Sequence, residues 1–451
     1  MYTLFDWQEA DVQAALKHDS WFLAYEMGLG KTLVTVEWAK RKAAETVIVV
    51  CPLNTRDSWE ATIKEQIPGT DVFWLENTTK RVENFGYLKA KRPGWYLIGW
   101  ELMRTGILTG READLIVADE THKQANYGRS DQAIMLRQFT SQYKAALSGT
   151  PAANKPEGIF STLNWLWPKR YSSQWKWADN FWRTIRNGAV IEYVRELKPG
   201  GVIADIPMFT RRLRKDHRND MPAVIPEVPI AVDLTATQRR LYDRLSKEAG
   251  MWLDDGESFV STSVKLVENL RLRQILLGVP TMIDNEITFK ESAGSTKIDA
   301  LIEVLQTDEF KDQTFLVLTH SARFVPTVVA KLAKKGIKAK GFTGETPQNE
   351  RRGLIDDLGE TYQVMVAGIA AIGTGTDGLQ HKCHNLFWLS KHPEWLLNKQ
   401  ASFRLDRPGQ TEPINQWYTY VPGTVDEDSL ERLQEIEENL VEMIDAHPAV
   451  V

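Results

Sequence analysis

A lysine and a threonine behind a glycine-rich turn are the first residues here whose types and spacing could do chemistry. The segment reads Met27-Gly28-Leu29-Gly30-Lys31-Thr32, between an apolar strand expected at 21–24 and a helical run at 33–39. Glycines let backbone N–H groups close on phosphates. The lysine can reach the β and γ phosphates, and the threonine hydroxyl can bind magnesium. The segment therefore predicts a site for ATP with Mg²⁺, although Tyr25 occupies the place of the first glycine in the looser GxxxxGK[ST] pattern.

Two adjacent acids, Asp119 and Glu120, follow the apolar run 115–118, which is typical of a buried parallel strand. An acid at the carboxyl end of such a strand lies where α/β sheets bind ligands. We expect Asp119 to hold the magnesium ion and Glu120 to orient and deprotonate the attacking water. A solvated acidic loop is the alternative interpretation, and the phosphate-binding segment upstream favours the catalytic one.

Two further segments could serve the same chemistry. Ser148, Gly149 and Thr150 follow the strand expected at 144–147, as an ordinary turn or as a hydroxyl loop that couples an ATP site to a nucleic-acid track. Arg404 and Arg407 have the i, i+3 spacing of one helix face. They lie far along the chain from Lys31, so they could stabilise charge on the departing γ-phosphate from across a cleft, an effect worth roughly 10³ to 10⁵ in rate. A solvated basic face remains the alternative.

Taken together, these segments resemble the SWI/SNF-type ATPases, a branch of the superfamily II helicases, over residues 4–425. The resemblance is carried by LAYEMGLGKT, DETHKQANYGRS, LSGTP, RRLRKDHRNDMP, LRLRQILLGVP, STKIDALIEVL, GFTGETPQNERRGLIDDL and QASFRLDRPGQ. It implies two RecA-like lobes that hydrolyse ATP between them. It also implies an adenine-reading role for Gln8 and nucleotide contacts from the segment 27–32, from Gly375 and from Asp377.

The chain departs from the family pattern at four places. Tyr25 replaces an acid, and Thr121 replaces an alanine in the DEAH box. Residues 373–377 stand where the family has a glycine-rich loop ending in asparagine, and residues 392–395 replace an expected Trp-Asn-Pro. None of these departures touches Lys31, Asp119 or Glu120.

The resemblance further implies an ATP-driven translocase on duplex or forked DNA, in replication, recombination or repair. Its grip would come from backbone phosphates and would be independent of sequence. By analogy with superfamily II helicases, the candidate DNA contacts are Thr55, Ser321, Arg323, Thr343 and Thr374. The residues expected to couple hydrolysis to movement are Ser148, Thr150 and Gln400. A minimal motor core of this size fits a prokaryotic or viral fork remodeller, annealing helicase or recombination factor, and the compact layout is similar to the core of the HepA-related annealing helicases.

Two other classes of protein stay open at this stage. One is a strand-separating helicase on DNA or RNA, although DETH and SGTP stand where the DEAD-box RNA enzymes have DEAD and SAT. The other is a non-catalytic DNA-binding scaffold with a decayed ATPase, which the intact Lys31, Asp119, Glu120, Arg404 and Arg407 disfavour. Whether a protein partner recruits the chain is open.

Bulk properties bound the class of protein. The chain has 451 residues, 43% of them apolar, and a net charge of −5. Its two cysteines are too few for a disulfide framework, and no apolar run approaches the ~18 residues of a membrane span. These features predict a cytoplasmic protein without a secretory signal or membrane partner. The charge is uneven, since residues 169–218 hold 12 Lys or Arg against 5 acids and residues 426–445 hold nine acids and one base.

The elements that must position these residues form an α/β pattern of two RecA-like parallel-sheet lobes. Apolar strands alternating with helical segments predict a parallel sheet. We expect a first lobe at 1–165, a mainly helical insert rich in Trp and Arg at 166–290, a second lobe at 291–424 and an acidic amphipathic helix within 425–451. The expected strands are 21–24, 47–51, 96–100, 115–119, 145–147, 314–319, 337–342, 363–367, 385–389 and 415–420.

The insert allows two interpretations. Its clustered tryptophans can stack on bases or form a small core, and the core interpretation is favoured because duplex DNA exposes few unstacked bases. Arg211, Arg212, Arg214 and Lys215 fit phosphate contact and docking of the lobes equally well. Two helices are expected at 234–277, with Leu266, Leu270 and Ile275 on an interior stripe.

Overall fold

The chain divides into two compact units, which are described separately. The computed structural model describes residues 2–76, 79–124, 130–187, 190–217, 222–254, 262–283, 286–289, 294–373 and 377–445. Unit 1 comprises Met1–Asn219 and Ile436–Val451, and unit 2 comprises Asp220–Glu435. The division into four parts that the sequence predicts stays a prediction, because the two compact units do not separate the insert or the C-terminal helix from the lobes.

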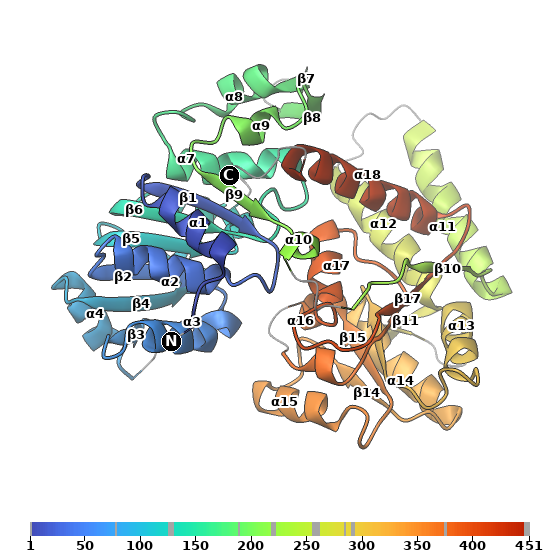
Figure 1. The fold of residues 1–451 in the computed structure, drawn as a ribbon. Coiled ribbons are helices and arrows are strands. Elements are labelled where there is room, and N and C mark those ends of the chain that lie inside the picture. Colours follow the sequence, from blue (N-terminus) through green and yellow to red (C-terminus); the bar gives the residue numbers. More distant parts are fainter. Residues whose placement is uncertain are drawn as a thin grey trace. The chain divides into compact units, whose positions relative to one another are not determined.

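Unit 1 is built on a seven-stranded parallel sheet with the order β3-β4-β2-β5-β6-β1-β9 (Figure 1). Its strands are β1 (Ser20–Tyr25), β2 (Thr46–Cys51), β3 (Val72–Trp74), β4 (Gly94–Gly99), β5 (Glu112–Asp119), β6 (Thr140–Leu147) and β9 (Phe209–Arg212). The helices between them are α1 (Asp6–Ala15), α2 (Lys31–Arg41), α3 (Arg56–Gln66), α4 (Arg81–Lys89), α5 (Trp100–Met103), α6 (Asp131–Leu136) and α7 (Ile159–Leu166). Four short 3₁₀ or α turns complete it: η1 (Leu53–Thr55), η2 (Thr121–Gln124), η3 (Pro156–Gly158) and α10 (Arg214–His217).

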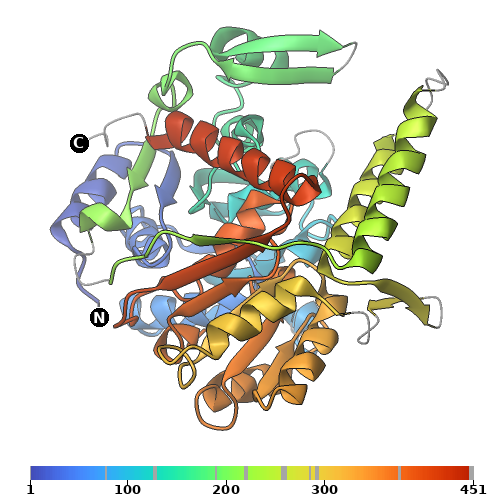
Figure 2. The same ribbon diagram turned by 90° about the vertical axis from the view of Figure 1, so that its right-hand side faces the viewer.

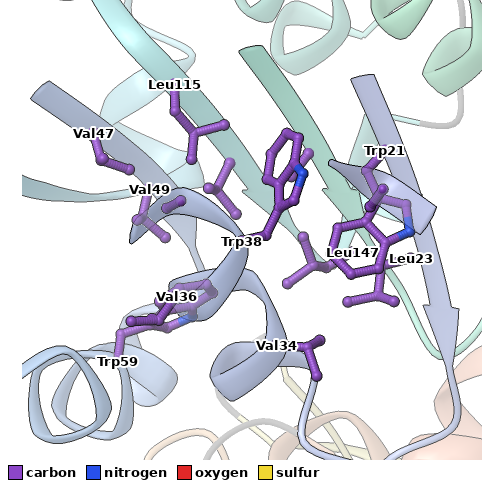
Figure 3. Packing of buried hydrophobic residues seen from close by; sticks show 14 of the residues in the cluster. Trp21, Leu23, Val34, Val36, Trp38, Val47, Val49, Trp59, Leu115 and Leu147 are labelled. Carbon is purple, nitrogen blue, oxygen red and sulfur yellow. The ribbon is translucent and has the colours of Figure 1, made fainter. Parts of the chain in front are cut away.

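The core under α2 holds this sheet and its helices together. Trp38 of α2 lies between the strands' apolar side chains, with its ring centroid 5.8 Å from that of Trp21 (Figure 3). Val34 and Val36 of the same helix are fully buried, as is Trp59 of α3. Full burial of an apolar side chain such as Val34 or Val36 stabilises the fold by roughly 1.5–3 kcal/mol per side chain. The helix that begins at Lys31 is thereby fixed on the sheet.

An extension of unit 1 carries α8 (Gln174–Phe181), the antiparallel hairpin β7 (Trp182–Asn187) with β8 (Val190–Glu196), and α9 (Gly201–Ala204) (Figure 2). Trp177 is its hub, with ring contacts to Phe160, Trp182 and Tyr193. Trp165, Trp177 and Trp182 are buried, whereas Trp175 is 41% exposed. Trp177 and Trp182 therefore belong to a small aromatic core, as the favoured interpretation predicted, whereas Trp175 lies at the surface.

Unit 2 contains a six-stranded parallel sheet with the order β10-β17-β16-β13-β15-β14. Its strands are β10 (Val228–Ala231), β13 (Phe315–Thr319), β14 (Ala339–Phe342), β15 (Val364–Gly368), β16 (Asn385–Trp388) and β17 (Asn415–Tyr420). Its helices are α11 (Ala236–Asp254), α12 (Thr262–Leu277), α13 (Thr296–Leu305), α14 (Val325–Lys334), α15 (Gln348–Asp357), α16 (Ile369–Ile372) and α17 (Trp395–Ser402). A small hairpin pairs β11 (Pro280–Ile283) with β12 (Glu286–Phe289), and η5 (Ala322–Phe324) and η6 (Leu379–His381) are 3₁₀ turns.

The acidic C-terminal segment forms the predicted amphipathic helix, α18 (Val425–Asp445). Leu433, Leu440, Met443 and Ile444 are buried along one side of it. In unit 2, Asp426 near its start pairs with Lys297, which is fully buried. In unit 1, Asp445 at its end accepts from Arg211 at 2.8 Å. The division between the units falls inside this one helix.

Two expectations about the insert were wrong in detail. Leu270 is 48% exposed, whereas Ile275 is buried as predicted; the other buried apolar residues described in α12 are Leu272, Leu276 and Leu277, and the side chain of Leu266 lies outside the described residues. The insert also supplies a strand to each sheet, β9 beside β1 and β10 beside β17. Both pairings are edge contacts between segments far apart in sequence, which local periodicity does not encode. Among the described residues, no helix is both long and apolar enough to cross a membrane.

Candidate nucleotide site

The glycine-rich turn between β1 and α2 has the backbone that a phosphate-binding loop requires. Gly28 and Gly30 adopt positive φ angles of 83° and 79°. Gly30 caps α2, and a side chain there would place its Cβ 2.9 Å from Nε2 of Gln8. Both strain and space thus demand glycine. Lys31 begins the helix, so its neighbours' N–H groups lie at a helix N-terminus.

The ammonium of Lys31 points back over the end of β1, where Nζ donates to Tyr25 O at 3.0 Å. A Cβ added to Gly149 would lie 3.7 Å from this Nζ, so the predicted coupling loop is next to the lysine. Burial lowers the pKa of Lys31, while the charges of Glu120 and Asp119 act to raise it. The lysine and both acids therefore form one electrostatic group.

Asp119 ends β5 and is held at two of its atoms by tryptophans. Trp59 Nε1 donates to its Oδ2 at 3.0 Å, and Trp100 Nε1 donates to its backbone oxygen at 2.9 Å. Burial raises the pKa of Asp119, and the adjacent negative charge of Glu120 raises it further. Sequence reasoning missed both tryptophans, since only the fold brings α3 and α5 against the end of β5.

Glu120 is one of the few non-glycine residues with a positive φ, 55°. A side chain in this left-handed region costs of order 1–3 kcal/mol, and such strain persists where the surroundings fix it. His122 Nδ1 lies 3.2 Å from Glu120 Oε2 and 3.3 Å from Ser148 Oγ. Burial acts to raise the pKa of Glu120, but His122 and Lys31 outweigh it and hold that pKa below its usual range. Glu120 is thus held as a carboxylate.

The coupling residues predicted at 148 and 150 lie beside these acids. Ser148 is buried, and its Oγ accepts from Thr150 N at 3.1 Å. Through His122 the hydroxyl of Ser148 is one side chain away from Glu120. These contacts join the acidic segment after β5 to the loop after β6. The sequence analysis did not predict this link, because it gave His122 no role.

Gln8 of α1 is buried beside the glycine-rich loop. Its Oε1 accepts from Phe5 N at 3.0 Å, and its Nε2 donates to Leu29 O at 3.0 Å. The structure therefore places Gln8 against the segment that contains Met27, Leu29 and Gly30. Thr32, the second residue of α2, follows Lys31 on the same loop-to-helix junction.

The arginines at the end of β9 and just after it make their contacts within unit 1. Arg211 donates to Asp445, to Ala24 O at 3.0 Å and to Gly149 O at 3.3 Å. Arg212 forms a two-point ion pair with Asp11. Arg214 N donates to Glu26, the guanidinium Nε of Arg214 lies 4.0 Å from Glu26 Oε2, and Lys215 is exposed. Ion pairs within unit 1 therefore account for the charges of Arg211, Arg212 and Arg214, without a phosphate contact or docking of the lobes.

The remaining candidates lie at the carboxyl ends of strands. Thr55 follows β2 in unit 1, and its hydroxyl donates to Pro52 O at 2.9 Å. In unit 2, Ser321 and Arg323 follow β13, and Thr343 follows β14, where its Oγ1 accepts from Glu345 N. Gln400 lies on α17, near Gly373. Thr374 and Gly375 lie outside the described residues.

Arg404 and Arg407 do not share a helix face as their spacing suggested. Helix α17 ends at Ser402, and both arginines lie in the turns that follow. Arg404 donates to Gly373 O, and Arg407 pairs with Asp377. Pro408 disfavours a helical conformation at Arg407, so the helix could not have continued through both arginines. Both guanidinium groups therefore hold the two ends of the loop 373–377 in unit 2.

Comparison with known proteins identifies a family whose sequence model matches this chain. A model described as the SNF2-related domain matches residues 12–277, which is more than half of the chain. The chain is similar to chromodomain-helicase-DNA-binding protein 1 of Gallus gallus, at 24% identity over 92% of this chain and 25% of that protein. It is also similar to the DNA annealing helicase and endonuclease ZRANB3 of Bos taurus, at 23% identity over 94% of this chain and 39% of that protein.

Among solved structures, the Hef helicase domain of Pyrococcus furiosus matches with a TM-score of 0.56 at 18% identity, over 94% of this chain and 97% of that one. This similarity supports the fold of two parallel-sheet α/β lobes. The chain spans only about a quarter to two fifths of the length of the relatives named above.

Proposed function

Since this chain belongs to the SNF2-related domain family, we propose that it is a DNA-dependent ATPase of helicase superfamily II that moves along or remodels duplex or forked DNA. The observation that carries the proposal is the meeting of Lys31, Asp119 and Glu120 at one edge of the unit 1 sheet. A helix N-terminus, a lysine and two acids are what phosphoryl transfer to water needs. The relatives' names, a DNA-binding helicase and a DNA annealing helicase, support DNA as the substrate.

The nucleotide would be ATP with Mg²⁺. The donors available at the site, the Thr32 hydroxyl and the Asp119 carboxylate, are hard oxygen ligands that suit this ion. Bound there, the ion would neutralise charge on the phosphates. The N–H groups at 27–32 and Lys31 bind the phosphates, while Gln8 reads the adenine edge. The N–H bond from Trp59 holds one carboxylate oxygen of Asp119, and the bond from Trp100 holds its backbone oxygen.

Hydrolysis needs a base placed before the substrate arrives. Glu120 fills this role, because His122 and Lys31 lower its pKa and keep the carboxylate ionised, while the contact with His122 holds it in place. It orients water and accepts its proton as the water attacks the γ-phosphate. The His122–Ser148 contact would pass the state of this acid to the Thr150 loop. Arg404 and Arg407 of unit 2 would stabilise the charge that develops on the γ-phosphate, exchanging their contacts to Gly373 and Asp377 for it.

Movement would follow from alternating grips on backbone phosphates. Thr55 in unit 1 and Ser321, Arg323 and Thr343 in unit 2 all follow carboxyl ends of parallel strands, the sheet edge where α/β folds bind ligands. Thr374 is proposed for the same role, and Gln400 for coupling. Contacts of this kind carry no base information, so DNA sequence should not matter. A cytoplasmic location is proposed for the chain.

Steady-state ATPase activity tests this function. We would compare no nucleic acid, single-stranded DNA, linear duplex, forked duplex and RNA, each at two salt concentrations. Strong stimulation by duplex or forked DNA that falls with salt is expected. Stimulation by single strands or RNA alone would indicate a strand-separating helicase. Absence of hydrolysis in every mixture would instead indicate a DNA-binding scaffold.

A further inference from the structure

The tyrosine that replaces the family's acid, Tyr25, is the last residue of β1 and is fully buried. Its hydroxyl donates to Asp11 Oδ2 at 2.6 Å. Arg212, at the end of β9, donates to the same carboxylate twice, from Nε to Oδ2 at 2.9 Å and from Nη2 to Oδ1 at 2.6 Å. Three elements, α1, β1 and β9, are therefore joined at one buried carboxylate.

The charges at this junction explain why position 25 is a tyrosine. A buried carboxylate is costly unless it is paired and fully hydrogen-bonded. Asp11 supplies the carboxylate that faces Arg212, so an acid at position 25 would bring two like charges together. A phenol instead donates a bond to Asp11. Burial, followed by the charge of Asp11, raises the pKa of Tyr25 well above its usual range, so the phenol keeps its proton.

Helix α1 carries this junction and the adenine-reading residue on the same side. Asp11 and Gln8 are three residues apart, which places them one above the other on a helix. The Asp11 bonds therefore fix the rotation of α1 and its position along β1. Gln8 in turn spans from Phe5 N to Leu29 O, with Gly30 so close that a Cβ there would overlap its Nε2. Trp7 packs on Tyr25 at 5.4 Å and on His217 at 4.4 Å between ring centroids.

We propose that Tyr25 and Arg212, acting through Asp11, are positioning residues that set the selectivity for the adenine base at Gln8. The inference rests on the proposed function of Gln8 and deepens it. A rotation of α1 would move the Gln8 amide away from the base edge without moving Lys31 or Glu120, which belong to other elements. The substrate class would thus be narrowed to adenine nucleoside triphosphates by a junction in which Asp11 and Arg212 lie outside the phosphate-binding motif.

The test is Tyr25→Phe, which removes one hydroxyl and keeps the buried ring. We expect the KM for ATP to rise about tenfold, the fold-change that 1.4 kcal/mol gives, with kcat within twofold. The ratio of kcat/KM for ATP to that for GTP should fall by a similar factor. A purely structural role would lower kcat/KM for ATP and for GTP by the same factor. Asp11→Asn should shift the ratio in the same direction, and far-UV circular dichroism verifies that each variant is folded.

Two controls separate this inference from the function it rests on. Tyr143→Phe removes a hydroxyl from a second tyrosine of the same sheet, which is only partly buried. This variant should leave the ratio of kcat/KM for ATP to that for GTP unchanged. Gln8→Ala should lower the ratio, and adding Tyr25→Phe to it should lower it no further, because the two act through one contact. If Gln8→Ala leaves the ratio intact, the adenine-reading role is wrong. If Gln8→Ala lowers it while Tyr25→Phe behaves like Tyr143→Phe, the positioning role is wrong.

Discussion

Single residues in unit 1 carry conformations that only a function explains. Glu120 has a left-handed backbone beside a buried aspartate, and its carboxylate contacts His122 with only 15% of the side chain exposed. Neither feature stabilises the fold, because strain and adjacent like charges both cost free energy. Their presence at the end of β5, close to Lys31, is what an assembled hydrolytic site requires.

Replacing this base should separate binding from turnover. Glu120→Gln keeps the shape of the side chain and removes its ability to accept a proton, so we expect DNA-stimulated kcat to fall at least about 10²-fold. Binding of a fluorescent ATP analogue should stay within a few fold. Glu112→Gln is the matched control, since Glu112 begins the same strand and pairs with Lys91 at the surface. Parent-level hydrolysis by Glu120→Gln would remove Glu120 from the mechanism.

A second residue-scale prediction concerns His320 in unit 2. Burial lowers the pKa of His320 to about 3, and its Nδ1 lies 2.8 Å from Ser390 Oγ. A folded-state pKa below the unfolded value of about 6.5 means that the unfolded chain binds the proton first. The stability that the neutral imidazole gives is therefore complete above pH 6.5 and is lost as pH falls towards 3. We expect a loss of roughly 1–3 kcal/mol between pH 7 and pH 4.

Urea unfolding of the parent and of His320→Asn at both pH values measures this loss. The asparagine cannot titrate in this range, so the variant should be less stable at pH 7 and should lose less on acidification. Equal losses in the two proteins would show that His320 does not set the acid sensitivity of unit 2.

At the scale of elements, the hairpin β7–β8 has basic side chains on one side and aromatic side chains on the other. Arg183 and Arg195 lie directly opposite each other on the exposed side of the hairpin, whereas Trp182 and Tyr193 pack into the aromatic core. Like charges facing each other across strands are destabilising. Within the part of the chain described, Glu196 is turned to the backbone of Gly200 and Val202, and Asp205 is paired with Arg170. The arginine pair is thus well suited to an anionic partner.

Removing this pair should weaken the proposed DNA binding. For Arg183→Ala with Arg195→Ala, we expect the slope of log K against log salt to fall in magnitude by about 2, since each phosphate contact contributes about 0.9. Basal ATPase activity should be unchanged. The control is Lys64→Ala with Arg104→Ala, which removes two exposed cations already paired on their own helices. Matching salt slopes for the two double variants would exclude the hairpin from the DNA contact.

At the scale of the whole molecule, the two units differ in what they can bind. Unit 1 contains Lys31, Asp119, Glu120 and Gln8, whereas unit 2 has a similar parallel sheet and contributes Arg404 and Arg407. Twelve of the 16 tryptophans lie in unit 1, so tryptophan fluorescence mainly reports on that unit. Ligand binding and unfolding of unit 1 can therefore be followed by its own signal.

A non-hydrolysable ATP analogue with Mg²⁺ should raise the fluorescence-detected melting temperature. At about 100 times Kd, binding stabilises by ~2.7 kcal/mol, which for a unit of this size corresponds to roughly 5–10 °C. In Lys31→Ala the shift should vanish, because the phosphates lose their cation. Arg41→Ala is the control, since Arg41 lies on the same helix but pairs with Glu9 at the surface. A full shift in Lys31→Ala would place the nucleotide elsewhere.

The sequence by itself determined the local features of this protein. Short apolar runs predicted the strands that now contain Trp21, Val49 and Val117, because burial on both faces of a parallel sheet leaves an apolar record in the chain. The types and spacing of Gly30, Lys31 and Thr32 predicted the loop-to-helix junction, since phosphate chemistry fixes both. The amphipathic pattern at 426–445 predicted α18, because apolar residues that recur with the helical period lie on one side of a helix.

Only the tertiary structure decided which distant residues meet. It brought Trp59 and Trp100 to Asp119, tied Tyr25 to Asp11 and Arg212, and added β9 to the first sheet. It also ended α17 before Arg404, against the helical spacing of the two arginines. Contacts of this kind depend on the mutual placement of whole elements. No local pattern records them, because a tryptophan or an aspartate has the same sequence neighbours whether or not it finds its partner.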